Sequence, residues 1–190
     1  MGQTMGKPGA AAIDESLYLD RLATEQEAFI ALYDHYFPRV YNYIRFRCFD
    51  ADMTDDLTAQ VFERALLKLG DFDPRQGSFG AWIFTIAHNL VSNHLRDLRR
   101  SRQLWEPLQE RPSSELSPEE ALLKSETEDE LLRTFAQLDD RQRNLLSLKF
   151  AARLTNRRIG EITGLSESHV GVIVHRALEK LRALLDERRQ

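Results

Sequence analysis

Residues 78–102 carry the side chains needed to hold opened DNA. Read as a helix, this stretch has a polar row made of Asn89, Asn93, Arg96 and Arg100. Amide groups bond base edges and guanidinium groups bond phosphates, while Phe79 and Trp82 stand near the start, where a base can stack. The alternative is an ordinary amphipathic helix, whose arginines complement the helix dipole and whose rings are core. Both interpretations stay open on this segment alone.

A second candidate DNA contact lies at residues 157–180, which are arranged as a helix-turn-helix. A short helix is followed by a turn at Gly164 and by a second helix, in which Val170, Ile173 and Ala177 are expected to face inward. The outward side chains are Ser168, His169, Val172, His175, Arg176 and Lys180. The alternative is a helical hairpin with a solvated basic face, but the turn and the charge sign favour DNA binding.

The acidic and histidine residues do not indicate a metal site or an active site. His88 and His94 are too far apart in sequence to share one helix face as ligands. The adjacent Asp55 and Asp56 are explained by the dipole of a first helical turn. Because phosphate loops and nucleophile motifs are also absent, we expect no catalytic residue, no metal and no cofactor, and the protein is not expected to be an enzyme.

Helices position both candidate surfaces, since no strand pattern occurs in the sequence. A capping box at Thr24 starts an apolar stripe that ends near Phe49, and Pro38 is expected to kink or split it. The next helix is predicted over 54–69, with Asp55 and Asp56 in its first turn, and a loop over 70–77 leads into the helix that begins near residue 78.

The second half of the chain is also predicted to be helical. Ser117, Pro118 and Glu120 resemble the start of a helix that reaches about residue 138. Three further helices are predicted from their caps: Asp139 with Gln142, Thr155 with the stop at Gly164, and Ser166.

Composition and charge fit a protein that touches a polyanion at two places. The chain has 190 residues, a net charge of −4 and one cysteine, Cys48, so no intramolecular disulfide can form. Residues 93–105 and 131–190 are basic, whereas residues 106–130 are acidic. No apolar run approaches the roughly 20 residues of a membrane span, so we expect no membrane insertion and a cytoplasmic protein.

These observations predict an all-α protein of two small helical domains. The expected divisions are a flexible tail over 1–23, a helical bundle over 24–102, an acidic, proline-containing linker over 103–116 and a helix-turn-helix domain over 117–190.

Five segments in order resemble the sigma-70 family of bacterial RNA polymerase sigma factors, and in particular the short extracytoplasmic-function (ECF) group that keeps only regions two and four. They are YDHYFPRVYNYIRFR (33–47), DDLTAQVFERALLKL (55–69), FGAWIFTIAHNLVSNHLRDLRR (79–100), LDDRQRNLLSLKF (138–150) and LTNRRIGEITGLSESHVGVIVHRALEKLR (154–182). The resemblance covers about residues 29–182.

The resemblance implies a docking helix for core RNA polymerase at residues 55–69. In such factors this helix binds the clamp helices of the largest subunit, while the flap of the second-largest subunit is a further contact. The implied contact residues here are Asp55, Asp56, Leu57, Val61 and Phe62. An anti-sigma factor that covers the same helix is also expected from the resemblance.

The resemblance further implies that region two binds the −10 element of a promoter. The loop at 71–78 would hold a flipped base, Asn89 and Asn93 would read bases, and guanidinium groups would hold phosphates, which agrees with the chemistry of a base taken out of its stack. The implied −10 residues are Asp71, Phe72, Ser78, Phe79, Trp82, Asn89, Asn93, Arg96, Arg99 and Arg100.

Region four would place residues 166–181 in the major groove of the −35 element, with the acidic linker running through the polymerase. The implied −35 residues are Ser166, Ser168, His169, Val172, His175, Arg176 and Lys180. Arg158 stands where family members often carry an acidic residue, and Gly171 with Val172 stands where many carry a basic one, so the −35 sequence does not carry over.

The expected function is therefore that of a sigma factor, which binds core polymerase, recognises and melts a promoter, and directs initiation. A stand-alone helix-turn-helix regulator would bind duplex DNA without polymerase. A protein-binding adaptor would use only the acidic helix at 55–69.

Overall fold

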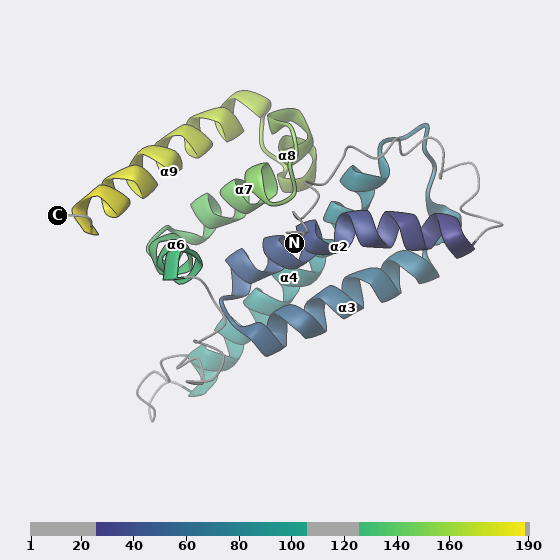
Figure 1. Ribbon diagram of the computed structural model, residues 1–190, viewed down its shortest axis with the longest axis horizontal. Helices are drawn as coiled ribbons and strands as arrows, with labels where there is room; N and C mark the ends of the chain where they lie inside the picture. The colour runs from purple at the N-terminus through teal and green to yellow at the C-terminus, as the bar shows by residue number, and fades with distance from the viewer. Residues whose placement is uncertain (1–25, 106–125, 189–190) are drawn as a thin grey trace, which may run out of the picture.

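The computed structural model describes residues 26–105 and 126–188. These two stretches contain seven α-helices joined by short connections, and no strand. Figure 1 shows the helices in two groups, with α2, α3 and α4 in the first and α6 to α9 in the second. The second group packs against the first mainly through α7 and α2. The prediction of an all-α protein with two helical units is confirmed.

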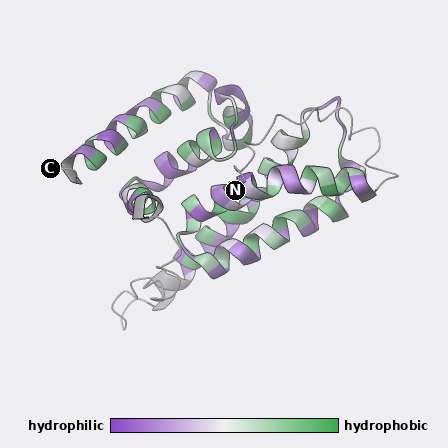
Figure 2. Ribbon diagram, viewed as in Figure 1, coloured by the Kyte–Doolittle hydropathy of each residue, from purple (hydrophilic) through white to green (hydrophobic). Residues whose placement is uncertain are grey.

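The first group is a three-helix bundle of α2 (Gln26–Cys48), α3 (Ala51–Leu67) and α4 (Phe79–Trp105). Each helix is amphipathic, as the green and purple faces in Figure 2 show. The apolar stripe of α2 supplies the centre of the core, and the side chains of Leu32, Tyr36, Val40, Tyr43 and Ile44 are at most 1% exposed. Because α4 packs against this stripe with its apolar face, the polar face of α4 is left toward solvent.

Pro38 does not split α2, which continues as a single helix from Gln26 to Cys48. Proline removes one backbone hydrogen bond and costs about 3 kcal/mol in a helix interior. The buried stripe on both sides of Pro38, including Tyr36 and Val40, offsets this cost through packing against α3 and α4.

Helix α3 begins earlier than predicted, because Asp50 is its cap. Asp50 accepts a hydrogen bond from the Met53 backbone N–H at 2.8 Å, directly after Phe49, whose φ of 58° ends the preceding helix. Thr54 was the predicted start, but it is buried and its hydroxyl donates to the Asp50 carbonyl at 2.6 Å. Asp52 therefore lies in the first turn, whereas Asp55 and Asp56 lie beyond it.

We expect Asp50→Ala to lower the free energy of unfolding by about 1 kcal/mol, because the Met53 N–H loses its acceptor. Asp50→Asn is the matched control, since asparagine caps a helix about as well as aspartate. Urea unfolding followed by circular dichroism measures both changes. Equal loss in the two variants would show that the charge of Asp50, and not its capping bond, is what matters.

A short loop joins α3 to α4 and contains the 3-10 turn η1 (Leu69–Asp71). Ser78 then caps α4, because its Oγ accepts from the Ala81 backbone N–H at 3.2 Å. The helix continues to Trp105, past the predicted domain end at residue 102. The remaining predicted linker residues and the predicted tail over 1–23 lie outside the described residues.

The second group consists of α6 (Glu126–Ala136), α7 (Asp140–Phe150), α8 (Asn156–Thr163) and α9 (Glu167–Arg188). The predicted caps of the last three helices are all present. They are the Asp139–Gln142 capping box, Thr155, Gly164 with a φ of 73°, and Ser166. The helix start predicted at Ser117 and Pro118 lies outside the described residues.

The turn between α8 and α9 depends on glycine at position 160. A Cβ atom on Gly160 would lie 2.5 Å from the carbonyl oxygen of Leu165, which is backbone and cannot rotate away. The same glycine accepts the hydrogen bond from the Leu165 N–H, which closes the turn. Close approach at this point sets the angle between the two helices of the helix-turn-helix.

Candidate nucleic-acid interface

The polar row predicted on α4 is present and faces outward. Its members Asn89, Asn93, Arg96 and Arg100 are all exposed, and so is Arg99, which only the family resemblance had assigned to phosphates. The opposite face is held in the core by Ala87, Leu90 and Val91. The guanidinium group of Arg96 donates to the Asn93 side-chain oxygen, so these two side chains are ordered relative to each other.

Four aromatic rings from three elements pack together at the start of α4. The ring centroid of Phe79 lies 5.4 Å from Tyr36, 5.5 Å from Phe72 and 5.3 Å from Trp82. Phe79 is only 1% exposed, so it belongs to the core and cannot stack on a base in this conformation. Phe72 and Trp82 are partly exposed, and they remain available at the surface.

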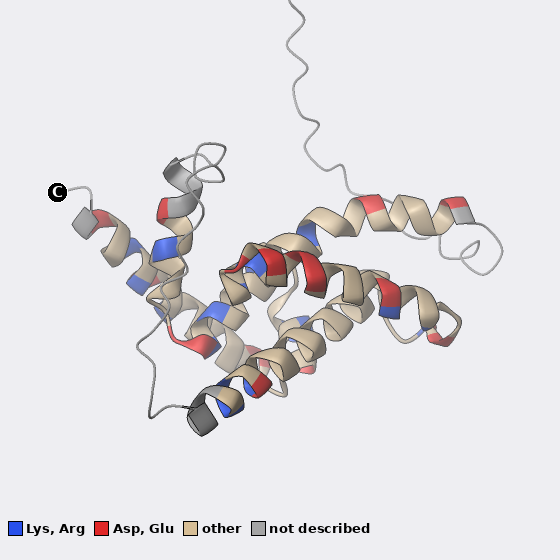
Figure 3. Ribbon diagram, turned by 90° about the horizontal axis from the view of Figure 1, so that it is seen from below, with Lys and Arg blue, Asp and Glu red and all other residues tan. Residues whose placement is uncertain are grey.

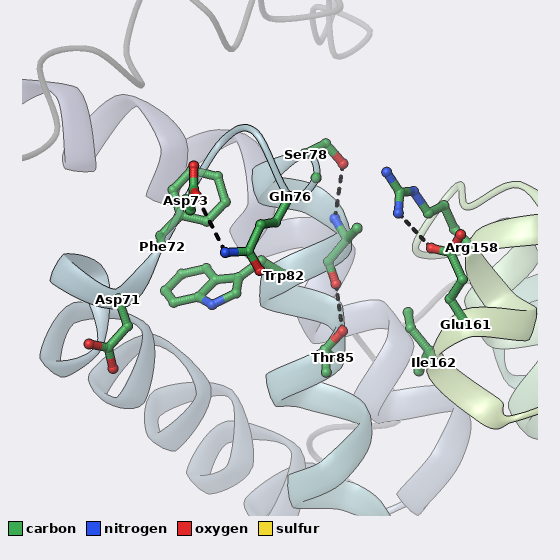
Figure 4. A pocket seen from close by; sticks show the side chains of 12 residues that line it. Asp71, Phe72, Asp73, Gln76, Ser78, Trp82, Thr85, Arg158, Glu161 and Ile162 are labelled. Carbon is green, nitrogen blue, oxygen red and sulfur yellow. Dashed lines mark hydrogen bonds and ion pairs between the residues drawn. The ribbon is translucent and has the colours of Figure 1, made fainter.

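Phe72 and Trp82 line a cavity of about 250 Å³ beside the loop that precedes α4 (Figure 4). The loop contributes Asp71, Asp73, Gln76 and Ser78 to its wall, and α4 contributes Thr85. An aromatic wall with hydroxyl, amide and carboxylate groups around it suits a planar base that needs both stacking and hydrogen bonds.

Asp73 organises the loop around this cavity. Its carboxylate accepts from the backbone N–H and the Nε of Arg75, both at 3.0 Å, and from the Gln76 side-chain amide at 3.3 Å. The bonds from Arg75 lower the pKa of Asp73 to about 2, with a smaller contribution from Gln76. The family resemblance assigned the loop at 71–78 as a whole to a flipped base, but none of these three residues was singled out from the sequence, although Asp73 followed by Pro74 is a recognisable turn signal.

The far wall of the cavity comes from the second group of helices. Arg158, Glu161 and Ile162 of α8 face the loop, as Figure 4 shows for their side chains. Arg158 pairs with Glu161 at 2.5 Å. Its guanidinium group lies close to the loop, 3.5 Å from the point where a Cβ atom added to Gly77 would stand. These residues are remote in sequence from the loop, so only the folded chain could reveal their position.

The second polar surface, on α9, also agrees with the prediction. Of the three residues predicted to face inward, Val170 and Ala177 are fully buried, whereas Ile173 is only half-buried. Val174 is 7% exposed and completes the buried side of the helix. The outward residues Ser168, His169, Val172, His175, Arg176 and Lys180 are all exposed. Two of these already have partners: Lys180 donates to the Gln137 carbonyl at 3.1 Å, and His175 lies 3.5 Å from Glu179. Ser166 accepts from the His169 N–H, which makes it the helix cap.

Helix α3 presents a different surface from the one predicted. Leu57, Val61 and Phe62 are 0–6% exposed, so they stabilise the bundle and are not accessible to a partner in this conformation. Asp55 and Asp56 are exposed, and Figure 3, seen from below, shows acidic positions as bands along α3. Leu66 and Leu67, which sequence reasoning did not select, are 56% and 78% exposed.

Two family models match the chain in the order of the two helical groups. Sigma-70 region 2 matches residues 32–101, which lie in α2 to α4, and Sigma-70 region 4 matches residues 134–183, which lie in α6 to α9. The ECF RNA polymerase sigma factor RpoE of Cereibacter sphaeroides is 30% identical, over 83% of this chain and 86% of that protein. The chain belongs to the ECF RNA polymerase sigma factors.

Two Streptomyces relatives are sigma factors of the same family. BldN of Streptomyces coelicolor is 33% identical over 87% of this chain, which spans 63% of the length of BldN. ShbA of Streptomyces griseus is also 33% identical, over 70% of this chain and 72% of that protein. The first group of helices is therefore region 2 of a sigma factor and the second group is region 4.

Two solved structures share the fold. CnrH, solved in complex with the cytosolic domain of CnrY, superposes with a TM-score of 0.67 at 25% identity, over 92% of this chain and 97% of that chain. RpoE of Bartonella quintana, solved with the anti-sigma factor NepR, gives a TM-score of 0.72 at 21% identity, over 84% and 98%.

Two features are missing from the described parts of this sigma factor. None of its helices there is long and apolar enough to cross a membrane. Over the same residues, no group of three or more histidine, cysteine or acidic side chains is placed to hold a metal ion.

Proposed function

We propose that this chain binds core RNA polymerase as a dissociable specificity subunit, recognises a promoter, opens its −10 element and so directs transcription initiation. The observation that carries the proposal is the presence, in one chain, of region 2 and region 4 in order, each with an exposed polar helix face. Two separate DNA contacts are what a promoter with two recognition elements requires.

Region 2 binds the opened −10 element through α4 and the loop before it. Asn89 and Asn93 read exposed base edges, because amide groups can both donate and accept. A flipped base enters the cavity lined by Phe72 and Trp82, where stacking on an aromatic ring replaces the stacking lost from the duplex. Arg96, Arg99 and Arg100 hold phosphates at the edge of the melted segment.

Region 4 binds the −35 element through α9 in the major groove. Ser168 and His169 lie at the N-terminal end, where a recognition helix touches base edges. Val172 is 47% exposed and suits a thymine methyl group, while Arg176 and Lys180 suit phosphates. The basic character of this face agrees with a phosphate-dominated affinity.

Core polymerase binds region 2 at the outer face of α3. Asp55 and Asp56 supply negative charge to this face. The exposed side chains of Leu66 and Leu67 supply apolar surface that a bound partner would remove from water. The clamp helices of the largest subunit are the partner of this face, and the flap of the second-largest subunit is the partner of region 4.

An anti-sigma factor is the proposed regulator of this chain, since it would cover the polymerase-binding face of α3. A protein of the same fold, CnrH, was solved with a protein partner bound. The site of action is the cytoplasm, where the polymerase and the chromosome are. Sigma factors are in general non-enzymatic regulators, and we propose that this chain has no catalytic activity and no cofactor of its own.

Reconstitution with core polymerase tests the proposed function. Core enzyme and the purified chain are incubated with a genomic promoter library, and transcript starts are sequenced. We expect starts that require the chain and share two upstream elements. The proposal fails if no chain-dependent start is found, and tight sequence-specific binding of the isolated chain to duplex DNA would indicate a stand-alone regulator instead.

A further inference from the structure

Arg153, at the corner between α7 and α8, has a backbone conformation that favours glycine. Its φ is 55°, in the left-handed region, and Phe49 is the only other described non-glycine residue with a positive φ. This conformation is disfavoured for residues with a side chain, because the Cβ atom comes too close to the following carbonyl oxygen. Glycine would adopt it without that penalty. The path of the chain therefore does not explain an arginine at this position.

Packing does not explain Arg153 either. Phe49 is partly buried against the core, and its ring lies 5.4 Å from the Arg143 guanidinium group. The side chain of Arg153 is exposed, and it makes no hydrogen bond or ion pair with any residue that the structure describes. Its neighbours Ala152 and Leu154 are buried and hold the corner in place. Arg153 thus leaves a guanidinium group in solvent at a position where glycine would be more stable.

The corner around Arg153 is basic. Residues 151–163 contain three arginines and one acidic residue, Glu161, which gives a net charge of +2. Arg157 and Arg158 share that carboxylate, at 3.2 Å and 2.5 Å. The side chain of Arg157 is nevertheless 76% exposed. Because the excess positive charge faces water, this corner attracts a polyanion.

Asn156 connects the basic corner to the outward face of α9. It is the first residue of α8, and its amide nitrogen lies 3.4 Å from the point where a Cβ atom added to Gly171 would stand. Gly171 comes three residues after Ser168 and four before His175, so it lies in the row proposed to face the −35 element. The Cα atoms of Arg153 and Asn156 are at most about 11 Å apart. The corner and the recognition helix therefore border each other.

The order of the helices decides which part of DNA the corner meets. In a helix-turn-helix the second helix enters the major groove, while the first crosses the sugar-phosphate backbone. Here α8 is the first helix and α9 is the second, and the two pack against each other (Figure 1). A side chain at the corner before α8 then reaches phosphates that border the groove. A guanidinium group suits this place, because it is always charged and pairs with two phosphate oxygens at once.

We propose that Arg153 binds a backbone phosphate beside the −35 element, a contact made by no side chain of α9. This inference deepens the −35 binding proposed above and rests on it. A phosphate contact carries no sequence information, so Arg153 strengthens the binding of region 4 to any −35 sequence, and base choice stays with α9. The left-handed arginine is thus kept for DNA affinity at the expense of stability.

Arg153→Gly and Arg153→Lys separate the charge of this residue from its backbone conformation. Glycine accepts the left-handed backbone and removes the charge, whereas lysine keeps both the charge and the strain. We expect the melting temperature of Arg153→Gly to be no lower than that of wild type, because relief of the strain offsets the chain entropy that glycine loses on folding. A loss of DNA affinity in this variant then does not come from unfolding.

The salt dependence of promoter binding tests the contact. Holoenzyme is titrated onto a promoter duplex recovered from the genomic library, between 50 and 200 mM salt. Loss of one phosphate contact reduces the steepness of log K against log salt by about 0.9. We therefore expect Arg153→Gly to weaken binding about threefold more at 50 mM than at 200 mM.

Two control variants accompany the salt series. Arg153→Lys should keep the wild-type slope, since a lysine also neutralises a phosphate. Arg133→Gln removes the same charge from an exposed position on α6, outside the helix-turn-helix, and should also keep it. A wild-type slope in Arg153→Gly would overturn the proposal, and so would an equal change of slope in Arg133→Gln, because that change would reflect net charge alone.

Single methylphosphonate substitutions in the DNA locate the contact. Each phosphate in and beside the −35 element is replaced in turn by the uncharged group, and holoenzyme affinity is measured. We expect one or two adjacent positions at which wild type loses affinity and Arg153→Gly loses no more, because the partner is already missing. If every substitution weakens both proteins by the same factor, Arg153 binds no phosphate and the proposal is wrong.

Core binding and transcription separate this proposal from the proposed function. If the wild-type chain initiates but Arg153→Gly keeps the wild-type slope, only the phosphate contact is wrong. If Arg153→Gly weakens the affinity for core polymerase and leaves the slope unchanged, the corner binds protein and the proposal is overturned. If the wild-type chain neither initiates nor protects a −35 element in holoenzyme, the proposed function fails, and the role of Arg153 fails with it.

Discussion

Holoenzyme that carries Asn89→Ala and Asn93→Ala is expected to form open promoter complexes at least about tenfold less efficiently than wild type. Both amides are exposed on α4, where they can reach base edges of the displaced strand. Loss of a good base contact costs about 1–3 kcal/mol, and each 1.4 kcal/mol corresponds to a factor of ten. Fluorescence of a base analogue in the −10 element measures opening directly.

Affinity for core polymerase should be unaffected by this double substitution, because the polymerase face of region 2 is assigned to α3. Asn42→Ala, which removes an exposed asparagine from α2, is the matched control for loss of an amide from the same region. Equal losses of core binding and of opening would contradict the assignment of Asn89 and Asn93 to base reading.

The other large effect is expected from Gly160→Ala. The added Cβ would lie 2.5 Å from the Leu165 carbonyl oxygen, so the turn between α8 and α9 must move. Overpacking of this kind typically costs about 1–3 kcal/mol, and it also tilts the proposed recognition helix. We expect lower stability in urea unfolding and a loss of protection at the −35 element in footprints of the holoenzyme.

Gly70→Ala is the control for this substitution, because nothing lies within 4 Å of its Cβ position. It should leave both stability and the −35 footprint close to wild type. A Gly160→Ala chain with normal stability and a normal −35 footprint would show that the close approach at Leu165 can relax without consequence.

Local rules predicted the helices of region 4 well. The capping pairs at Asp139 and Gln142, the Thr155 cap and the left-handed Gly164 depend only on residues within one turn, and all are present. The start of α3 was predicted at the wrong residue because Thr54 followed by two aspartates also resembles a cap. Phe49, with its positive φ, ends the preceding helix, so α3 is capped four positions earlier than Thr54, at Asp50.

Burial was harder to predict than helix position. Leu57, Val61 and Phe62 were assigned to a partner surface, but they lie on the face of α3 that packs against its own bundle. Phe79 was left between core and stacking, and its contacts with Tyr36 and Phe72 place it in the core. Which face of an amphipathic helix is covered depends on neighbours that are distant in sequence.

The contact between the two regions was beyond sequence reasoning. Asp140 meets Arg47 and Arg99 only because α7 packs on α2, and Arg158 reaches the loop near Gly77 only because α8 lies beside α4. Ion pairs of this kind have no periodic signature, since each partner belongs to a different unit. The resemblance to sigma factors likewise specified surfaces for partners, but not how the regions meet in the free chain.

Permanganate footprinting of a promoter recovered from the genomic library tests the central claim most directly, because permanganate modifies unpaired thymines. With core polymerase and this chain together, we predict reactive thymines within the −10 element, and none with either component alone. Duplex that stays unreactive under all three conditions, or thymines that become reactive with core polymerase alone, would contradict the account of this chain as the factor that opens the promoter.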